Sequence, residues 1–594
     1  MEIDNVKAMV SLQLHGFALY SFIWLWASLS STWRNVLLSL TVFISFRYAW
    51  VVLRYRRARR HYHIHDNGIE RVPPTYPTLM PFLGSSFYLM WDTALFNRIA
   101  TSYRGELTST RISLLGSAIY MFQDRETVCK IMRQRSYLTP IAVRFVFPAK
   151  SLFGMPEDNG LDAYRVDDSG PLERARAGSN IPSQDRIDYL HHQAFQRAFM
   201  GPGLTPITLR FRASIRAQVT ALSLNSPQWT EVGDLFALVG KLVSAAITEA
   251  IFGPSLLQLH PDFIDNMWAY DGALPWLVRM IPRWINPQPH RARDKVLEQI
   301  KEWHIYARQG FQEDNVEPDR DSDPFWGSEM VRHLHKVLVE SKKHSNDAMS
   351  AHDLGLIWGA AALATFHIFA DPDLLSRVRA ELEEHLPHLS SPSSFEAIGT
   401  KQFNGLPLLS SIYAETLRLY SNVFLMVASP PDTDVPLGKW KFPRRSFGLV
   451  STALAHTDKR FWNTKDDAYP VDTFWADRFL VYREDPESGP IRPEFRADRM
   501  NWQQEERNFQ DKSRSNPRYS TEGLEGSWLP YGAGVGMCPG RFLSKDVIIS
   551  TCALLVSEYD IETLTESLDM DPWRFGLSLG RPRSAVAARI RKRR

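Results

Sequence analysis

The feature that most constrains this chain is a glycine-rich loop that presents one cysteine. In the stretch WLPYGAGVGMCPGRF, residues 528–542, glycines at alternate positions precede Cys538, and a Pro-Gly pair follows it. From Phe542 onward apolar residues recur at helical spacing, which predicts that the cysteine lies near a helix N-terminus. The helix dipole and free backbone N–H groups favour a thiolate there, and Pro539 removes one competing donor.

Glycines also let a loop pass close to a flat partner. The residues therefore indicate a stabilised sulfur that faces a large planar group, and an iron porphyrin with a thiolate axial ligand fits. The alternative is a buried structural cysteine in a glycine-rich turn, since free cysteines are usually core residues.

Composition favours a folded, enzyme-sized body. Of 594 residues, 44% are hydrophobic and 23% are charged, which is ordinary globular usage and argues against disorder, collagen and coiled coil. The net charge is only +3, and basic residues gather behind an apolar segment and in the final RIRKRR, which favours a membrane surface and no nucleic acid. The cysteines Cys129, Cys538 and Cys552 form no disulfide framework or C-x-x-C pair, which indicates a reducing compartment.

Two apolar runs near the start predict a membrane anchor. The first covers residues 8–31, and the second, residues 36–53, is just long enough to span a bilayer and is followed by RYRRARR. The basic flank should stay cytoplasmic, and Arg47 should reach back to the same interface. One span or two remain possible; a cleaved signal peptide is disfavoured because no small-residue cleavage site follows.

The predicted division of the chain has three parts. Residues 1–60 form the membrane anchor with its basic flank, residues 61–84 a proline-rich hinge, and residues 85–594 the catalytic domain. Periodic stretches in the third part read as helices and the strand-like runs are short, so the fold class is mostly α with small β-sheets. The tryptophan-rich residues 265–287 either meet a membrane, line an access route, or pack in the core.

The cysteine segment resembles the haem-binding loop of the cytochrome P450 family. The matching positions are Tyr531, Gly534, Gly536, Cys538 and Gly540. Tyr531 replaces the usual phenylalanine and Gly536 the usual basic residue, and the ending CPGR resembles the branch of sterol 7α-hydroxylases, prostacyclin synthase and related fungal enzymes. The resemblance implies a cytochrome P450 fold behind the anchor and a haem b bound by Cys538, with Tyr531, Gly534 and Gly540 around it.

Three charged residues elsewhere match further elements of that family. Glu415 and Arg418 in SIYAETLRLY share a helix face, although such pairs are common and are often solvated. Arg478 in DTFWADRFL resembles the arginine of the family's P-E-R-F element, and the resemblance implies that the three charges brace the fold beneath the haem. His456, in a His-x-Asp pair that also matches, is expected to have a structural role.

The helix that activates oxygen in the family departs from the pattern. Between Trp358 and Pro372 the chain looks about seven residues short, which is about two helical turns. Thr365 remains as the catalytic candidate, but no Asp, Glu, Asn or Gln lies between Asp353 and Asp371 to relay a proton. A mis-drawn exon boundary, a catalyst that rearranges an oxygenated substrate, and a degenerate protein all remain possible; the similar flanks favour the first.

The helix expected to hold the haem propionates also lacks its usual residues. In its place stands YLHHQAFQRAFMGPGL, where His192 or Arg197 could bind the cofactor or could be ordinary surface residues.

These patterns together predict a membrane-bound haem-thiolate monooxygenase. It would oxidise an apolar substrate, such as a sterol, a terpenoid or another secondary metabolite, with O2 and electrons from NADPH-cytochrome P450 reductase. The expected location is the endoplasmic reticulum membrane, with the catalytic domain cytoplasmic. The alternatives are a reductase-independent haem-thiolate isomerase or dehydratase, and a haem- or lipid-binding protein without turnover.

Overall fold

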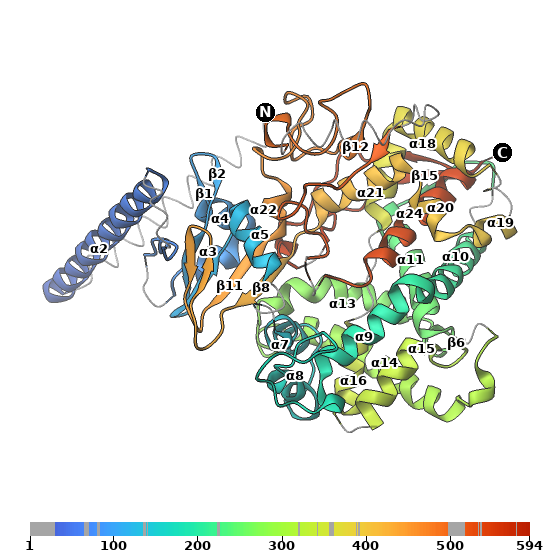
Figure 1. Ribbon diagram of the computed structural model, residues 1–594, viewed down its shortest axis with the longest axis horizontal. Helices are drawn as coiled ribbons and strands as arrows, with labels where there is room; N and C mark the ends of the chain where they lie inside the picture. Colours follow the sequence, from blue (N-terminus) through green and yellow to red (C-terminus); the bar gives the residue numbers. More distant parts are fainter. Residues whose placement is uncertain are drawn as a thin grey trace.

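The computed structural model is mostly helical with small sheets, as predicted (Figure 1). It describes residues 30–64, 71–79, 83–134, 138, 140–222, 226–318, 321–340, 343–355, 361–387, 389, 392–496, 517–532, 534, 537–577 and 579–593. Most of the apolar run at residues 8–31 lies outside these ranges, and so does Gly536.

Helix α2, Ser31–Ile64, projects from the body at the left of Figure 1. Its 34 residues run through the basic flank without a break, so the helix is longer than the apolar run that predicted it. By length and composition, two described helices could cross a membrane: α2, whose apolar window is unburied, and α11, Leu235–Phe252, which is mostly buried in the body. Of these two described helices, only α2 has the exposed apolar surface of an anchor.

The second half of α2 docks on the body. The Tyr55 hydroxyl donates to the carbonyl of Ala100 at 3.3 Å, and Arg59 lies over the Tyr103 ring. Arg47 donates to the carbonyl of Leu79 in the hinge at 3.1 Å, so its side chain contacts the hinge, where the sequence predicted a reach toward an interface. The hinge in turn pairs with the small sheets through a bridge from Thr75 to Arg111.

A four-stranded sheet lies beside this junction, in the order β3-β4-β11-β8. Strands β3, Thr110–Leu114, and β4, Ser117–Met121, are antiparallel, and β11, Phe447–Ser451, joins β4 in parallel. Strand β8, Phe424–Ala428, closes the sheet against β11. A second sheet has the order β14-β15-β5, with bounds Tyr559–Thr563, Ala588–Lys592 and Thr230–Val232.

Four two-stranded sheets complete the β structure of the described residues. They are β1 Ser102–Tyr103 with β2 Glu106–Leu107, β6 Ser322–Asp323 with β7 Gly327–Ser328, β9 Val435–Leu437 with β10 Trp440–Phe442, and β12 Leu480–Val481 with β13 Arg518–Tyr519.

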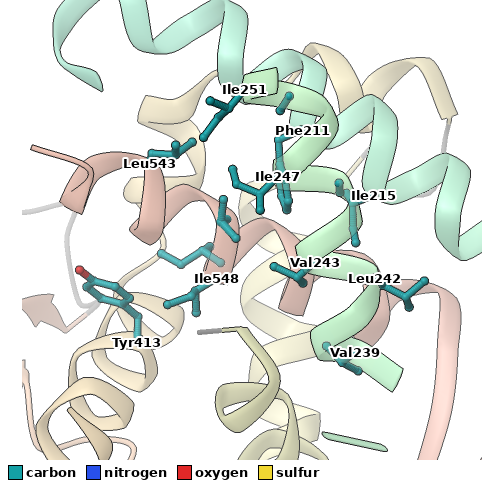
Figure 2. Packing of buried hydrophobic residues seen from close by; sticks show 14 of the residues in the cluster. Phe211, Ile215, Val239, Leu242, Val243, Ile247, Ile251, Tyr413, Leu543 and Ile548 are labelled. Atoms are coloured by element: carbon teal, nitrogen blue, oxygen red, sulfur yellow. The ribbon is translucent and has the colours of Figure 1, made fainter. Parts of the chain in front are cut away.

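The core is built from helices α10, Leu204–Ala221, α11, α17, Ala361–Ala370, α21, Pro407–Tyr420, and α24, Arg541–Glu558. Figure 2 shows Phe211, Val243 and Ile548 from three of these helices pointing toward one another. Helix α24 contacts α10, α17 and α21, and every residue from Asp546 to Val556 is buried, as expected for a helix surrounded by protein. The cysteine loop therefore leads directly into the most central helix.

The remaining α-helices surround this core. They are α3 Ser86–Trp91, α4 Thr93–Ala100, α5 Arg125–Arg133, α7 Ile141–Ser151, α8 Asp162–Val166, α9 Ile187–Phe199, α12 Ser255–Leu259, α13 Phe263–Val278, α14 Pro287–Gly310, α15 Glu329–His335, α16 Asn346–Leu354, α18 Pro372–His385, α19 Pro392–Ala397, α20 Thr400–Asn404 and α22 Thr452–His456.

Candidate active site

Cys538 lies just before α24, as the sequence predicted. Gly540 caps the helix, the Cys538 N–H donates to the Tyr531 carbonyl at 3.0 Å, and Arg541 donates to the Cys538 carbonyl at 3.0 Å. The side chain itself is exposed, so the alternative of a buried structural cysteine is wrong. The loop holds its backbone and leaves its sulfur accessible to a ligand.

Loop geometry explains two of the glycines. Gly532 and Gly534 have φ of 73° and 63°, a left-handed region that side chains other than glycine rarely adopt. A Cβ on Gly540 would lie 3.7 Å from the Cys538 sulfur, so a side chain there would stand beside the presented atom.

The thiolate is less favoured by the chain than the helix dipole alone suggested. Although Cys538 is exposed as a residue, protein atoms crowd around its thiol, and this desolvation raises the pKa of Cys538 above its ordinary value. The Gly540 N–H and Arg541 act in the opposite direction. A bound metal ion would supply the missing stabilisation, because a coordinating thiol is deprotonated outright.

A tyrosine pair fixes the ring of Tyr531 under the loop. The Tyr413 hydroxyl donates to the Tyr531 hydroxyl oxygen at 3.0 Å. Burial raises the pKa of Tyr531 to about 12, so its hydroxyl stays neutral at physiological pH. The Lys545 ammonium lies 5.8 Å from the Tyr413 ring and 4.7 Å from that of Tyr519. The sequence predicted neither Tyr413 nor Lys545 as part of the site. The one feature that could have indicated them is that each lies on a helical stretch next to a matched motif.

Glu415, Arg418 and Arg478 form one fully buried ionic network. Arg418 binds the Glu415 carboxylate through two nitrogens at 2.7 and 2.8 Å, and Arg478 Nε lies 3.0 and 3.1 Å from the same two oxygens. All three side chains have 0% exposure, so a solvated ion pair is excluded. Burial alone would raise the pKa of Glu415, but the two guanidinium groups outweigh it and hold that pKa below its ordinary value.

His456 connects this network to the cysteine loop. Its Nε2 accepts the backbone N–H of Leu529 at 2.8 Å, and its carbonyl accepts from Arg418 at 2.8 Å. Burial lowers the pKa of His456 to about 3, so the ring is neutral and can accept that bond. The expected structural role of His456 is therefore to hold the start of the loop.

Three other predicted residues lie on helices around α24. Thr365 of α17 is fully buried, with its hydroxyl oxygen 3.8 Å from the Cys552 sulfur of α24. Helix α9 also contacts α24; it carries His192, half-buried, and Arg197, exposed in its last turn. Residues 356–360 lie outside the described ranges, so the shortened helix and the roles of Thr365, His192 and Arg197 remain predictions.

The loop suits a cofactor that brings its own equatorial ligands. Within the described ranges, no group of three or more His, Cys, Asp or Glu side chains is placed to hold a metal ion. A single presented sulfur can therefore serve only as one ligand of a preassembled complex, and a haem iron needs just such an axial ligand. The residues present fit that group.

Curated relatives identify the chain. It is 30% identical over 538 residues to the cytochrome P450 monooxygenase efuG of Hormonema carpetanum, covering 88% of this chain and 90% of the relative. The cytochrome P450 monooxygenase fsoE of Humicola fuscoatra is 30% identical over 550 residues, covering 89% of each. The chain belongs to the cytochrome P450 family.

A more distant relative of this cytochrome P450 is the 25-hydroxycholesterol 7-alpha-hydroxylase of Rattus norvegicus, 20% identical over 60% of this chain and 77% of the relative. No family model matches the chain. Membership confirms the predicted resemblance, the haem cofactor with cysteine thiolate ligation, and the assignment as a monooxygenase of the oxidoreductase class.

Proposed function

We propose that this cytochrome P450 is anchored through α2 in the endoplasmic reticulum membrane, with its catalytic domain on the cytoplasmic side. There it oxidises an apolar substrate with O2 and with electrons from NADPH-cytochrome P450 reductase. The presentation of the Cys538 sulfur at the start of α24, in a chain whose relatives are monooxygenases, carries the proposal.

The residues around the cysteine loop divide the tasks of this function among them. When bound, haem supplies the activation of dioxygen and the transfer of one oxygen atom. The Cys538 thiolate would hold the haem iron, and Tyr531, Gly534 and Gly540 would shape the surface around the sulfur. Glu415, with Arg418 and Arg478, keeps the loop in register through His456.

Exposed aromatic side chains on the body also support attachment to a membrane. Trp91 at the end of α3 is 77% exposed and Trp284, after α13, is 84% exposed. Helix α4 contacts the turn that holds Trp573, whose ring lies 5.1 Å from that of Trp276. Large aromatic side chains favour the lipid–water interface, and their exposure to water is costly.

A membrane surface also supports the substrate class. Sterols, terpenoids and similar secondary metabolites partition into lipid, so an enzyme attached there meets them at high local concentration. The named substrate of the rat relative, 25-hydroxycholesterol, is one such molecule.

The test begins with the absorption spectrum of the reduced, carbon monoxide-bound protein beside Cys538→Ala. A red-shifted Soret band that the substitution abolishes is expected. NADPH consumption that depends on both reductase and a sterol or terpenoid should follow. Turnover without NADPH would instead establish the isomerase or dehydratase alternative, and haem binding without any turnover would establish the non-enzymatic one.

A further inference from the structure

Five buried histidines lie together among helices that are labelled in the lower half of Figure 1. They come from α9, α14, α15, α16 and the segment just before α16, and each is less than one-tenth exposed. No pattern in the sequence points to this grouping, because its members are far apart along the chain. We call it the histidine cluster; it consists of His191, His304, His335, His344 and His352.

One carboxylate, Asp353 at the end of α16, holds two of the rings. His304 Nε2 lies 2.8 Å from Asp353 Oδ2, and His352 Nδ1 lies 3.0 Å from Asp353 Oδ1. Burial alone would raise the pKa of Asp353, but the two ring N–H groups outweigh burial and hold that pKa below its ordinary value. Asp353 is therefore ionised and ties α14 to α16 by buried charge-assisted hydrogen bonds.

The other three rings have no carboxylate within hydrogen-bond distance in the described part of the chain. His191 stacks on His352 with ring centroids 4.8 Å apart. His344 lies 3.0 Å from the hydroxyl oxygen of Tyr164 in α8. His335 packs on the Trp326 ring at 4.4 Å and lies 3.2 Å from an Arg308 nitrogen. These contacts suit neutral rings, since none offers an anion to an imidazolium.

Desolvation acts on the same three rings. Burial lowers the pKa of His335 and of His344 to about 3, and it lowers the pKa of His191 well below its ordinary value. His191 Nε2 and His344 Nδ1 are buried without a hydrogen-bond partner among the described residues, so neither has an acceptor for an added proton.

Nearby carboxylates oppose burial only in part. Asp162 and Asp353 raise the pKa of His344, and Asp353 raises that of His335, but desolvation outweighs them. Asp188 is paired with Arg144, Lys301 with Asp347, and Lys343 with Asp185. The charged groups that act on the three rings are Arg144 of α7, Asp162 of α8, Arg308 of α14, Lys343, and Asp353 of α16. Tyr164 of α8, and Asp188 and His192 of α9, are the titratable groups beside them.

We propose that the histidine cluster makes the packing of the surrounding helices sensitive to pH. It holds α8 and α9 against α14, α15 and α16 only while His191, His335 and His344 are neutral, and mild acid opens it. Because α9 also contacts α24, opening loosens one support of the helix that follows the cysteine loop.

The sign and size of the effect follow from linkage. These histidines have a folded pKa below the unfolded value of about 6.5, so their stabilisation is present above that pH and is lost as pH falls below it. Between pH 7.5 and 5.5, each such ring raises the opening equilibrium constant about tenfold, so three rings give about a thousandfold.

Hydrogen exchange of the haem-loaded full chain in bilayer nanodiscs tests the proposal. Opening constants are taken from peptides covering residues 162–166, 187–199 and 346–354, after correction for intrinsic exchange. The key variant is His191→Phe, which keeps an aromatic ring between Phe195 and His352 but cannot be protonated. The matched control is His385→Phe, the same change at an exposed histidine of α18.

The expected result is an approximately thousandfold rise in opening for the unmodified chain and for His385→Phe, and about a hundredfold rise for His191→Phe. A rise below tenfold in the unmodified chain would overturn the proposal. So would His191→Phe opening with the full pH dependence, or peptides 559–563 and 588–592 opening equally, which would indicate global unfolding. If His191→Phe does not fold, His335→Phe decides by the same criteria.

Discussion

Arg478 offers the sharpest test of how the cysteine loop is supported. We expect Arg478→Ala to destabilise the protein much more than removal of an ordinary arginine from an ion pair. The guanidinium has 0% exposure, shares the Glu415 carboxylate with Arg418, and donates to the carbonyls of Pro470 and Thr473 at 3.3 Å each. Truncation leaves the carboxylate with one counter-ion and leaves these carbonyls without that donor.

The magnitude follows from what the truncation leaves behind. Removing one partner of a buried ion pair costs about 3–5 kcal/mol, because the remaining charge stays desolvated. Arg418 still neutralises Glu415, which places the charge contribution near the lower end. The carbonyl groups that lose a donor add about 1–3 kcal/mol when they stay buried. We therefore expect a total loss of about 4–6 kcal/mol in the free energy of unfolding.

Urea denaturation, followed by circular dichroism and by haem absorbance, measures this loss. Arg589→Ala is the control, since Arg589 pairs with Glu562 on the surface, where both side chains are nearly half exposed. Exposed pairs contribute less than about 1 kcal/mol, so the control should be close to the unmodified protein. Equal destabilisation by the two substitutions, or a loss below about 2 kcal/mol for Arg478→Ala, would refute the reasoning.

Three further predictions concern stability. Tyr413→Phe and Tyr531→Phe should each lower the free energy of unfolding by about 1 kcal/mol. A double-mutant denaturation cycle should give a coupling energy of similar size, and independent effects would contradict the 3.0 Å bond between the hydroxyls. Burial lowers the pKa of Lys545 from 10.5 to about 8. Below pH 8 the folded protein therefore carries the full free-energy penalty of a buried charge, and above pH 10.5 this penalty vanishes because the side chain is neutral in both the folded and the unfolded state. Lys545→Met should therefore stabilise the protein at pH 7, by at most about 3 kcal/mol, and by nothing at pH 11; an equal gain at both values would refute this. Gly576→Ala should lower the melting temperature more than Gly178→Ala. Both glycines have φ of 88°, but only a Cβ at position 576 would meet a phenylalanine ring, at 2.4 Å. Equal losses in thermal denaturation would contradict this.

Local spacing accounts for what could be predicted from the sequence. Glu415 and Arg418 are three residues apart on one helix, so their pairing follows from helical geometry. The position of Cys538 before α24 follows from the glycine pattern and the apolar period behind it. The helical class follows in the same way, although α2 extends beyond its apolar run because arginine is a good helix former.

Contacts between distant segments could not be predicted in this way. The bond from Leu529 to His456 joins residues 73 positions apart, and the bond from Tyr413 to Tyr531 spans 118 positions. No periodicity relates such residues, since their meeting depends on how several helices pack. The same holds for the histidine cluster, whose first and last members along the chain, His191 and His352, lie on α9 and α16.

The two long-range contacts support the loop at different points, and this has a measurable consequence. Arg478 acts on Leu529 through Glu415, Arg418 and His456, whereas Tyr413 acts on the ring of Tyr531. The two routes share none of these hydrogen bonds. Substitutions without shared partners combine additively within about 0.5 kcal/mol. Arg478→Ala combined with Tyr413→Phe should therefore lose the sum of the two single effects in urea denaturation. Arg478→Ala combined with His456→Ala should lose less than the sum, because both act through Arg418, and additivity there would show that His456 holds the loop without the ionic network.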